Sequence, residues 1–354
     1  MTGPAGRPSA MQTLRRVVPK SVRRGASVHL ARMRSARLRR HLAALAADSR
    51  PIVAGPWLGE VGFELLYWVP FLRWFAEEFE IAPGRLVVVS RGGTWAWYAP
   101  FSSRYREVFD YVGPEEFRRR HDERVLDLGE QKQTRMTAFD RELLDRIARR
   151  TGSHDCLYLH PSVMYDVMNP FWWQHVDENW VHRHARYRRL QAPPRHDAGA
   201  LPPSYIAVKF YFNDCFPATD ANRTFVRDAI RRLADRAPVV SLTTGLSLDD
   251  HGSADAEGAP VTRLPAHLDP RRNLHVQSAI VAGASAFVGT YGGFSYLAPF
   301  YGVPSTAYYG NPEGFSPRHL LMARSAFTAL GGRDLLQVEP IPPAGLSASM
   351  TQHS

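Results

Sequence analysis

The chain has 354 residues, of which 44% are hydrophobic and 22% are charged, as expected for a globular protein that buries a core. The formal net charge is +10, but residues 1–50 contain 12 Lys or Arg and one acid, so the remaining 304 residues carry a net charge of −1. A nearly neutral body lacks the basic surface that nucleic-acid-binding proteins carry, which argues against that class.

The two cysteines, Cys156 and Cys215, are too few for a disulfide framework, and no Cys/His spacing typical of a metal site accompanies them. No apolar run reaches the roughly 18 residues that a membrane span needs. The basic N-terminus is not followed by the apolar segment of a secretory signal. We therefore expect a cytoplasmic protein that needs neither a metal nor another cofactor.

The first 50 residues are expected to form a basic arm. Residues 1–27 are rich in Gly, Pro, Ser and Arg, a composition typical of disorder. Residues 28–47 have helical spacing, with arginines around a short apolar face. That face would hold Ala31, Leu38, Leu42 and Leu45. Such a helix can lie on an anionic membrane surface, which makes residues 1–47 a candidate membrane contact, or it can cap the first domain.

Short apolar runs alternate with helical patterns from Pro51 onward, which predicts parallel βαβ units. In the first half, strands are expected at 52–54, 86–90, 124–128 and 156–160, and helices at 61–79 and 137–150. Residues 191–204 are rich in Pro and Ala and form the expected linker.

The same alternation restarts after the linker. Strands are expected at 205–210, 239–243, 286–289 and 305–309, and helices at 221–236, 274–283 and from about 294, with a polar excursion at 249–258. The whole pattern predicts an α/β protein with two Rossmann-type, doubly wound domains, 51–195 and 204–340. In such folds ligands bind at the carboxyl ends of the strands, so we expect a site in the cleft between the domains.

One candidate loop joins the first strand to its helix, with the sequence GPWLGEVGFE over residues 55–64. Its glycines let the backbone approach a ligand, and the free N–H groups of a helix start suit an anion or a hydroxyl. Glu60 stands where the helix begins, so its carboxylate could act as the general base for an acceptor hydroxyl. It could instead cap the helix. The expected acceptor contacts in this loop are Trp57, Gly59, Gly62 and Glu64.

A second candidate loop lies within residues 287–304, where a buried strand runs into a glycine turn and a helix. Glycines here would remove side chains where a diphosphate approaches the helix start, and neighbouring hydroxyls could bind it. The expected donor contacts are Thr290, Tyr291, Gly292, Gly293 and Ser295. The alternative is a plain turn whose glycines allow tight packing.

Lys209 is expected at the end of the first strand after the linker, where its charge could stabilise a leaving diphosphate in place of a metal. It could equally be a lysine at the surface end of a strand, in which case Arg223 is the substitute. Further candidate donor contacts, each also compatible with a structural role, are Asn213, Thr244, Gly245, His275 and Gln277.

Both loops resemble motifs of GT-B glycosyltransferases. FVGTYGGFSYLAPFYGVPSTAYYG is similar to the donor-site signature of lipopolysaccharide heptosyltransferase-like enzymes, and Gly59-Glu60, opening a helix that contains Pro70, resembles their N-terminal motif. The resemblance covers one segment of about 30 residues in each half. It implies a catalytic base at Glu60. The family usually has Asp at the position of Thr290 and His at that of Ser295, which implies a donor other than ADP-heptose. The GTYGGFS segment is also similar to the turn of fucosyltransferase-like enzymes.

The resemblance implies metal-independent, inverting transfer of a sugar from a nucleotide-sugar donor to a hydroxyl of a glycan or lipid-linked acceptor. The donor would bind the C-terminal domain and the acceptor the N-terminal domain. The substitutions at Thr290 and Ser295 leave a second interpretation open, a non-catalytic nucleotide- or carbohydrate-binding protein of the same fold. Nucleic-acid binding through the basic arm is a third and weaker one.

Overall fold

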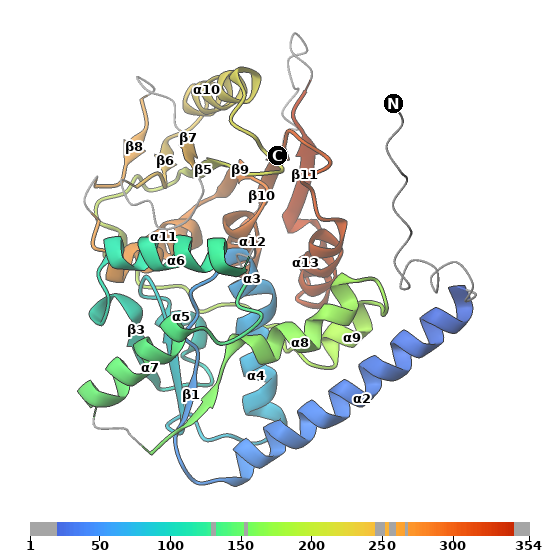
Figure 1. Ribbon diagram of the computed structural model, residues 1–354. Helices are drawn as coiled ribbons and strands as arrows, with labels where there is room; N and C mark the ends of the chain where they lie inside the picture. Colours follow the sequence, from blue (N-terminus) through green and yellow to red (C-terminus); the bar gives the residue numbers. More distant parts are fainter. Residues whose placement is uncertain are drawn as a thin grey trace, which may run out of the picture.

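The computed structural model describes residues 20–128, 132–151, 155–244, 252–254, 260–265 and 268–342. These residues form two α/β halves, with the N-terminal half below the C-terminal half in Figure 1. Within the described ranges, no helix combines the length and the apolar character needed to cross a bilayer. One hydrophobic cluster includes residues of both halves, so the halves are packed against each other.

The N-terminal half contains a four-stranded parallel sheet. Its strands are β1 (Ile52–Ala54), β2 (Leu86–Ser90), β3 (Arg104–Glu107) and β4 (Leu157–Leu159). Runs of Val and Leu favour extended backbone, and every residue of β1 and β2 is buried. The spatial order is β3-β2-β1-β4, so the direction of strand addition reverses between β1 and β4.

Helices surround this sheet. They are α2 (Lys20–Ala47), α3 (Val61–Phe63), α4 (Val69–Glu78), α5 (Trp95–Tyr98), α6 (Pro114–Leu128), α7 (Ala138–Thr151), α8 (Pro161–Trp172) and α9 (Glu178–His182), with a 3₁₀ turn at Val108–Asp110. The helix expected over 61–79 is confirmed, but a π-helical turn, Glu64–Trp68, separates α3 from α4. Single π turns inside α-helices occur frequently at functional sites.

The C-terminal half is built on a larger parallel sheet. Its strands are β5 (Ile206–Phe212), β6 (Val239–Ser241), β8 (Thr262–Arg263), β9 (Ala286–Thr290), β10 (Ser305–Tyr309) and β11 (Leu336–Pro340). The order is β11-β10-β9-β5-β6-β8, and β7 (Gly252–Ala254) pairs antiparallel with the end of β5. Strand addition reverses between β5 and β9. Both halves therefore have the Rossmann-type topology that the sequence predicts.

The helices of this half are α10 (Asp220–Ala234), α11 (Asn273–Gly283), α12 (Gly293–Phe300) and α13 (Pro317–Ala329). Short 3₁₀ turns lie at Arg195–Ala198, Pro270–Arg272 and Arg333–Leu335. The first of these is in the expected linker, which is otherwise irregular between residues 191 and 204.

The strand expected over 124–128 is wrong, because these residues are the last turns of α6. That helix begins with Pro114 at its first position and two acids in its first turn, which are strong helix-start signals. The short apolar run that suggested a strand is not a buried one, since the side chain of Leu126 is 84% exposed.

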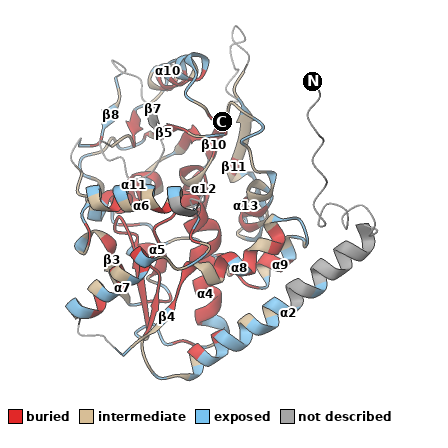
Figure 2. Ribbon diagram, viewed as in Figure 1, coloured by how far each residue is buried: buried red, intermediate tan, exposed pale blue. Residues whose placement is uncertain are grey.

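The arm also differs from expectation where it is described. Helix α2 begins at Lys20, so residues 20–27, expected to be disordered, are helical, while residues 1–19 lie outside the described ranges. Leu42 and Leu45 are buried and α2 packs on α8, which favours the capping interpretation for its C-terminal part. Figure 2 shows the exposed outer face of this helix.

Candidate functional site

The strand-order reversals place the candidate site. Ligands of such sheets bind beyond the carboxyl ends of the strands on either side of the reversal. In the N-terminal half these are β1, followed by the loop 55–60, and β4. In the C-terminal half they are β5 and β9, and β9 leads into the glycine turn that begins α12.

The two loops meet directly through α3 and α12. A Cβ atom added to Gly62 in α3 would lie 3.2 Å from the Cα of Gly293, the first residue of α12. A Cβ on Gly293 would lie 2.8 Å from the Gly62 nitrogen, and one on Gly292 would overlap the hydroxyl of Tyr211. Tight packing therefore requires these glycines. The same packing brings the starts of two helices, one from each half, to one place.

Glu60 stands immediately before α3 and is half-buried. Its backbone is extended, and its carbonyl accepts the N–H of Glu64 at 3.1 Å to close the first helical turn. Its carboxylate makes no capping hydrogen bond to α3. Glu60 is therefore not a hydrogen-bonding cap of α3, while its place before the helix start is the one at which the helix dipole favours an acid.

Glu64 lies one turn further on and is completely buried. Its Oε1 accepts hydrogen bonds from the hydroxyls of Ser90 at 2.6 Å and Tyr98 at 2.5 Å, whereas its Oε2 has no hydrogen-bond partner. Desolvation raises the pKa of the Glu64 carboxyl to about 7, against the opposing effect of those hydrogen bonds and of the nearby charge of Arg91. The expected acceptor contact at Glu64 has no exposed surface in this structure.

Arg91, at the carboxyl end of β2, holds the first loop in place. Its side chain is only 3% exposed, and its Nη2 donates to the Gly59 carbonyl at 2.7 Å. Trp57 on the same loop is fully buried, stacked between Trp68 and Tyr165. Trp57 thus anchors the loop from within the core.

The buried side chain of Gln133 also holds this loop in place. Gln133 is buried, accepts the N–H of Leu58 at 2.8 Å and donates to the carbonyl of Pro56 at 2.9 Å. It also lies 3.4 Å from Asp140, which pairs with His160 beyond the end of β4. Desolvation opposes ionisation of Asp140, but His160 and the Thr137 hydroxyl and N–H together hold the pKa of its carboxyl below its usual range.

The polar side chains of the second loop are used within the fold. The Thr290 hydroxyl accepts the Tyr211 N–H at 3.0 Å and donates to the Tyr211 carbonyl at 2.9 Å. Ser295 accepts the Gly292 N–H at 3.1 Å and donates to the Gly292 carbonyl at 2.7 Å. Tyr291 is buried and packs against Tyr296 and Phe315. The N–H groups of Tyr291 and Gly292 are bonded to the Tyr308 carbonyl and the Ser295 hydroxyl, so the main-chain groups that remain for a ligand are those of the first turn of α12.

Lys209 lies in the middle of β5, and its expected position at the strand end is wrong because β5 continues to Phe212, where it pairs with β7. Its ammonium donates to Gln277 Oε1 at 2.5 Å and lies 4.0 Å from the ring centre of Phe294, in the first turn of α12. The positive charge of Lys209 therefore lies next to the first turn of α12. Gln277 is fully buried on α11.

The other expected donor contacts are dispersed. His275 is buried on α11, stacks on Trp95 and bonds Asp197 of the linker at 2.9 Å. Asn213 bonds the Phe216 N–H, and the exposed Arg223 lies over the ring of Phe212. Thr244 is half-buried after β6, and Gly245 lies outside the described residues.

The residues that sequence reasoning missed are Arg91 and Gln133, together with the pair Asp140–His160. Arg91 carried an available signal, since it follows a buried strand directly, as catalytic and binding residues in these folds do. Gln133 carried no such signal, because its contacts with the first loop join positions 75 or more residues apart. Asp140 carried none either, because it reaches the loop only through Gln133.

No family model matches the sequence, and no curated protein matches it. Among solved structures, the chain is similar to the E. coli heptosyltransferase WaaC with ADP, at 15% identity and a TM-score of 0.41, over 83% of this chain and 93% of that one. It is similar to the E. coli ADP-heptose lps heptosyltransferase II, at 13% identity and a TM-score of 0.43, over 84% and 91% of the chains.

A third similar structure is a glycosyl transferase family 9 protein from Veillonella parvula DSM 2008, at 15% identity and a TM-score of 0.44, over 84% of this chain and 87% of that one. At identities this low, the chemistry of this chain has to be inferred from its own residues.

Proposed function

We propose that this chain is a glycosyltransferase that moves a sugar from a nucleotide-diphosphate sugar to a hydroxyl of a glycan or lipid-linked acceptor. The observation that carries the proposal is the contact between Gly62 and Gly293. It brings together the two helix starts that follow β1 and β9, the strands at which the order reverses in each sheet. Free N–H groups at a helix start favour bound negative charge, such as that of a diphosphate. The donor would bind at α12 and the acceptor beside Glu60.

The proposed reaction is a single displacement. The acceptor oxygen attacks the anomeric carbon, its proton passes to the carboxylate of Glu60, and the bond from the anomeric carbon to the diphosphate oxygen breaks with its electron pair leaving on the diphosphate. One attack on the face opposite the leaving group inverts the anomeric centre. The helix start and the ammonium of Lys209 beneath it would stabilise the leaving charge without a metal.

Binding of donors tests this proposal. Purified protein would be titrated calorimetrically with UDP-, GDP-, ADP- and dTDP-sugars and with the free nucleotides. We expect one nucleotide class to bind with a dissociation constant below the millimolar range, and its sugar conjugate to release nucleoside diphosphate when an acceptor is added. Absence of binding by every member of the panel would contradict the proposal.

A non-catalytic protein that binds a nucleotide or a carbohydrate is the second candidate. The observation that favours it is the engagement of the Thr290 and Ser295 hydroxyls in hydrogen bonds to the main chain. Donor binding without release of nucleotide, either by hydrolysis or in the presence of an acceptor, would select this candidate over the enzyme.

We also propose that α2 brings the protein to the inner face of the cytoplasmic membrane. This helix has no acidic residue, and Arg34, Arg37 and Arg40 are exposed on its described part. Because Leu42 and Leu45 are buried, a deletion should stop before them. A protein that lacks residues 1–33 and carries Arg34→Gln, Arg37→Gln and Arg40→Gln should bind vesicles containing phosphatidylglycerol more weakly than the full chain does, with equal weak binding to phosphatidylcholine. Equal binding of both proteins to the anionic vesicles would contradict the proposal.

A further inference from the structure

A cavity of about 250 Å³ lies between α6 and the segment that leads into α7. Its walls are formed by Arg120, Glu123, Arg124, Arg135, Met136, Thr137, Ala138 and Phe139. Ligand pockets for drug-sized molecules are usually about 300 to 1,000 Å³, so this cavity suits a smaller chemical group. Three of its eight lining residues are arginines, whose guanidinium groups match the geometry of phosphates and carboxylates.

One of these arginines is almost completely buried. Arg124 is 5% exposed, and its Nη2 lies 3.0 Å from His121 Nδ1. Burial lowers the pKa of the Arg124 guanidinium, the charge of Asp140 raises it, and the charge of Arg91 lowers it further. The buried carboxylate of Asp140 thus favours the charged form of Arg124, which is a cation on the cavity wall.

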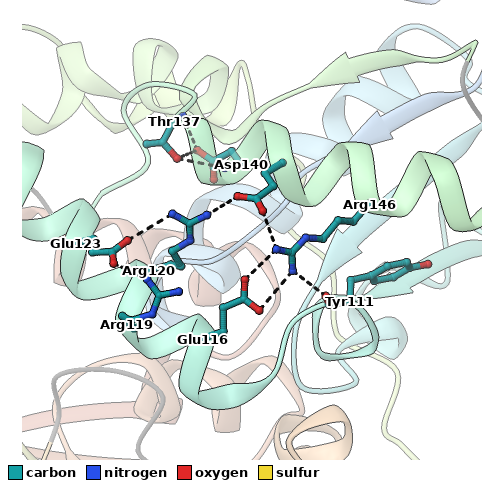
Figure 3. A network of polar contacts seen from close by, with 9 residues as sticks. Tyr111, Glu116, Arg119, Arg120, Glu123, Thr137, Asp140 and Arg146 are labelled. Atoms are coloured by element: carbon teal, nitrogen blue, oxygen red, sulfur yellow. Dashed lines mark hydrogen bonds and ion pairs between the residues drawn. The ribbon is translucent and has the colours of Figure 1, made fainter.

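Two of the described carboxylates near the cavity are each shared between two arginines. Glu123 pairs with Arg119 at 2.6 Å as well as with Arg120 at 3.5 Å. Glu142 pairs with Arg120 and, at 2.7 Å, with Arg146. Figure 3 shows the network that joins α6 to α7, with Arg120 and Arg146 labelled. Among the described residues that line the cavity, three are arginines, Arg120, Arg124 and Arg135, and one, Glu123, is a carboxylate.

The cavity is next to the first loop. Asp140 and Gln133 connect the start of α7 to the main chain at Pro56 and Leu58. Arg91, which is close enough to Arg124 to affect its pKa, donates to Gly59. Thr137 of the cavity wall is thus joined to the loop that precedes Glu60 through Asp140 and Gln133.

We propose that this cavity binds a phosphate or carboxylate group, and that the group belongs to the sugar acceptor. The second part rests on the proposed function, whereas the first does not. Arg135 and Arg124 bind the anion, and Arg120, which is held by Glu142, supplies additional positive potential. The acceptor is thus predicted to be anionic close to the hydroxyl that receives the sugar.

Inorganic phosphate is the probe for the first part, measured by calorimetry at low ionic strength on the full chain. Arg135→Gln should weaken phosphate binding by at least about fivefold, because a charge-assisted hydrogen bond is lost. Arg118→Gln is the matched control, since Arg118 is exposed on α6, which forms one wall of the cavity, and does not itself line the cavity. It removes the same charge and should change binding less than about twofold.

Two further variants keep the test decisive. Arg124→Gln should abolish measurable phosphate binding if it folds, and circular dichroism would show whether it does. Glu123→Gln removes a negative charge from the cavity wall and should tighten binding. Unchanged binding in Arg135→Gln together with no tightening in Glu123→Gln would overturn the proposal. So would equal weakening by Arg118→Gln, because that result would indicate general surface charge.

Turnover separates the acceptor from free phosphate as the source of the anion. With an anionic and a neutral acceptor of the same sugar, Arg135→Gln should raise KM for the anionic one alone and leave donor affinity unchanged. If Arg135→Gln changes KM by the same factor for both acceptors, the cavity is assigned to free phosphate and the second part is overturned. If phosphate binds through Arg135 while no nucleotide sugar binds at all, the proposed function fails and the anion site remains.

Discussion

The two loops that meet at α3 and α12 differ in how their polar side chains are used. After β1, Glu60 is half-buried and makes no capping hydrogen bond to α3, and the main chain beside it is held by Arg91 and Gln133. After β9, the hydroxyls of Thr290 and Ser295 are both bonded to main-chain groups of their own half. Side-chain chemistry is therefore available at the first loop, and mainly main-chain N–H groups are available at the second.

This difference teaches that a composition typical of a ligand loop does not say which atoms face the ligand. Glycine and small polar residues gather in the second loop, but the structure uses them to pack two helix starts together. The first loop has fewer polar residues, and the groups that prepare it come from elsewhere in the chain. The following variants test this contrast.

The largest expected effect is on catalysis by Glu60. Glu60→Gln keeps the size of the side chain and removes its basicity, so turnover should fall by about two orders of magnitude or more, the contribution expected of a general base. Donor affinity should remain nearly unchanged. Steady-state kinetics and calorimetry measure the two quantities. Glu64→Gln should lose much less turnover, and the reverse result would move the base one turn along the helix.

The buried carboxyl of Glu64 should make stability depend on pH. Its pKa of about 7 in the folded state exceeds the ordinary value of 4.5, so the folded protein retains a proton that the unfolded chain has released between these values. Stability should fall as pH rises, by up to about 3 kcal/mol between pH 5 and pH 8. Denaturant unfolding of the wild type and Glu64→Gln measures this term as the difference between the two pH profiles. Parallel profiles would contradict it.

Packing at the contact between the halves should be sensitive to one methyl group. Gly293→Ala places a Cβ 2.8 Å from the main-chain nitrogen of Gly62, which cannot move as a flexible side chain can. We expect a loss of about 1–3 kcal/mol in the free energy of unfolding. Gly113→Ala is the control, because nothing lies within 4 Å of its added Cβ. Equal stability of the two variants would show that the contact is not tight.

The smallest effect is expected at Ser295. Ser295→Ala removes the hydrogen bonds to Gly292 and should cost about 0.5–2 kcal/mol, as the loss of a helix-start capping contact does. Donor affinity should change less than about threefold, since main-chain groups bind the diphosphate. A tenfold or larger loss of affinity, measured by calorimetry, would show that the hydroxyl contacts the donor and that the two loops do not differ as described.

The fold could be predicted largely from sequence because the buried strands are apolar and short. The runs at Ile52–Ala54 and Ser305–Tyr309 give strands with the expected bounds. The strand prediction at 124–128 failed because a short apolar run also fits the end of a helix, and the start signals of that helix lie ten residues earlier, at Pro114. Strand β3 was not anticipated, because its residues Arg104–Glu107 are charged at three of four positions.

The candidate site could be predicted only in part, because local sequence does not report long-range contacts. The loop around Glu60 was identified from its glycines and its place before a helix. The contact of Gly62 with Gly293 joins residues 231 positions apart, and no spacing indicates it. The cationic cavity was hidden for a further reason, since assigning Arg124 to a strand removed it from the helix face that it shares with Arg120.

Hydrogen–deuterium exchange with the tightest-binding nucleotide sugar tests most directly whether the two loops form one site. The account predicts that main-chain amides of both segments, 55–62 and 290–295, become protected when the ligand binds, because the two helix starts are in contact. Protection should be lost when the ligand is removed by dilution. Binding that protects neither segment, or only amides far from both, would contradict the account.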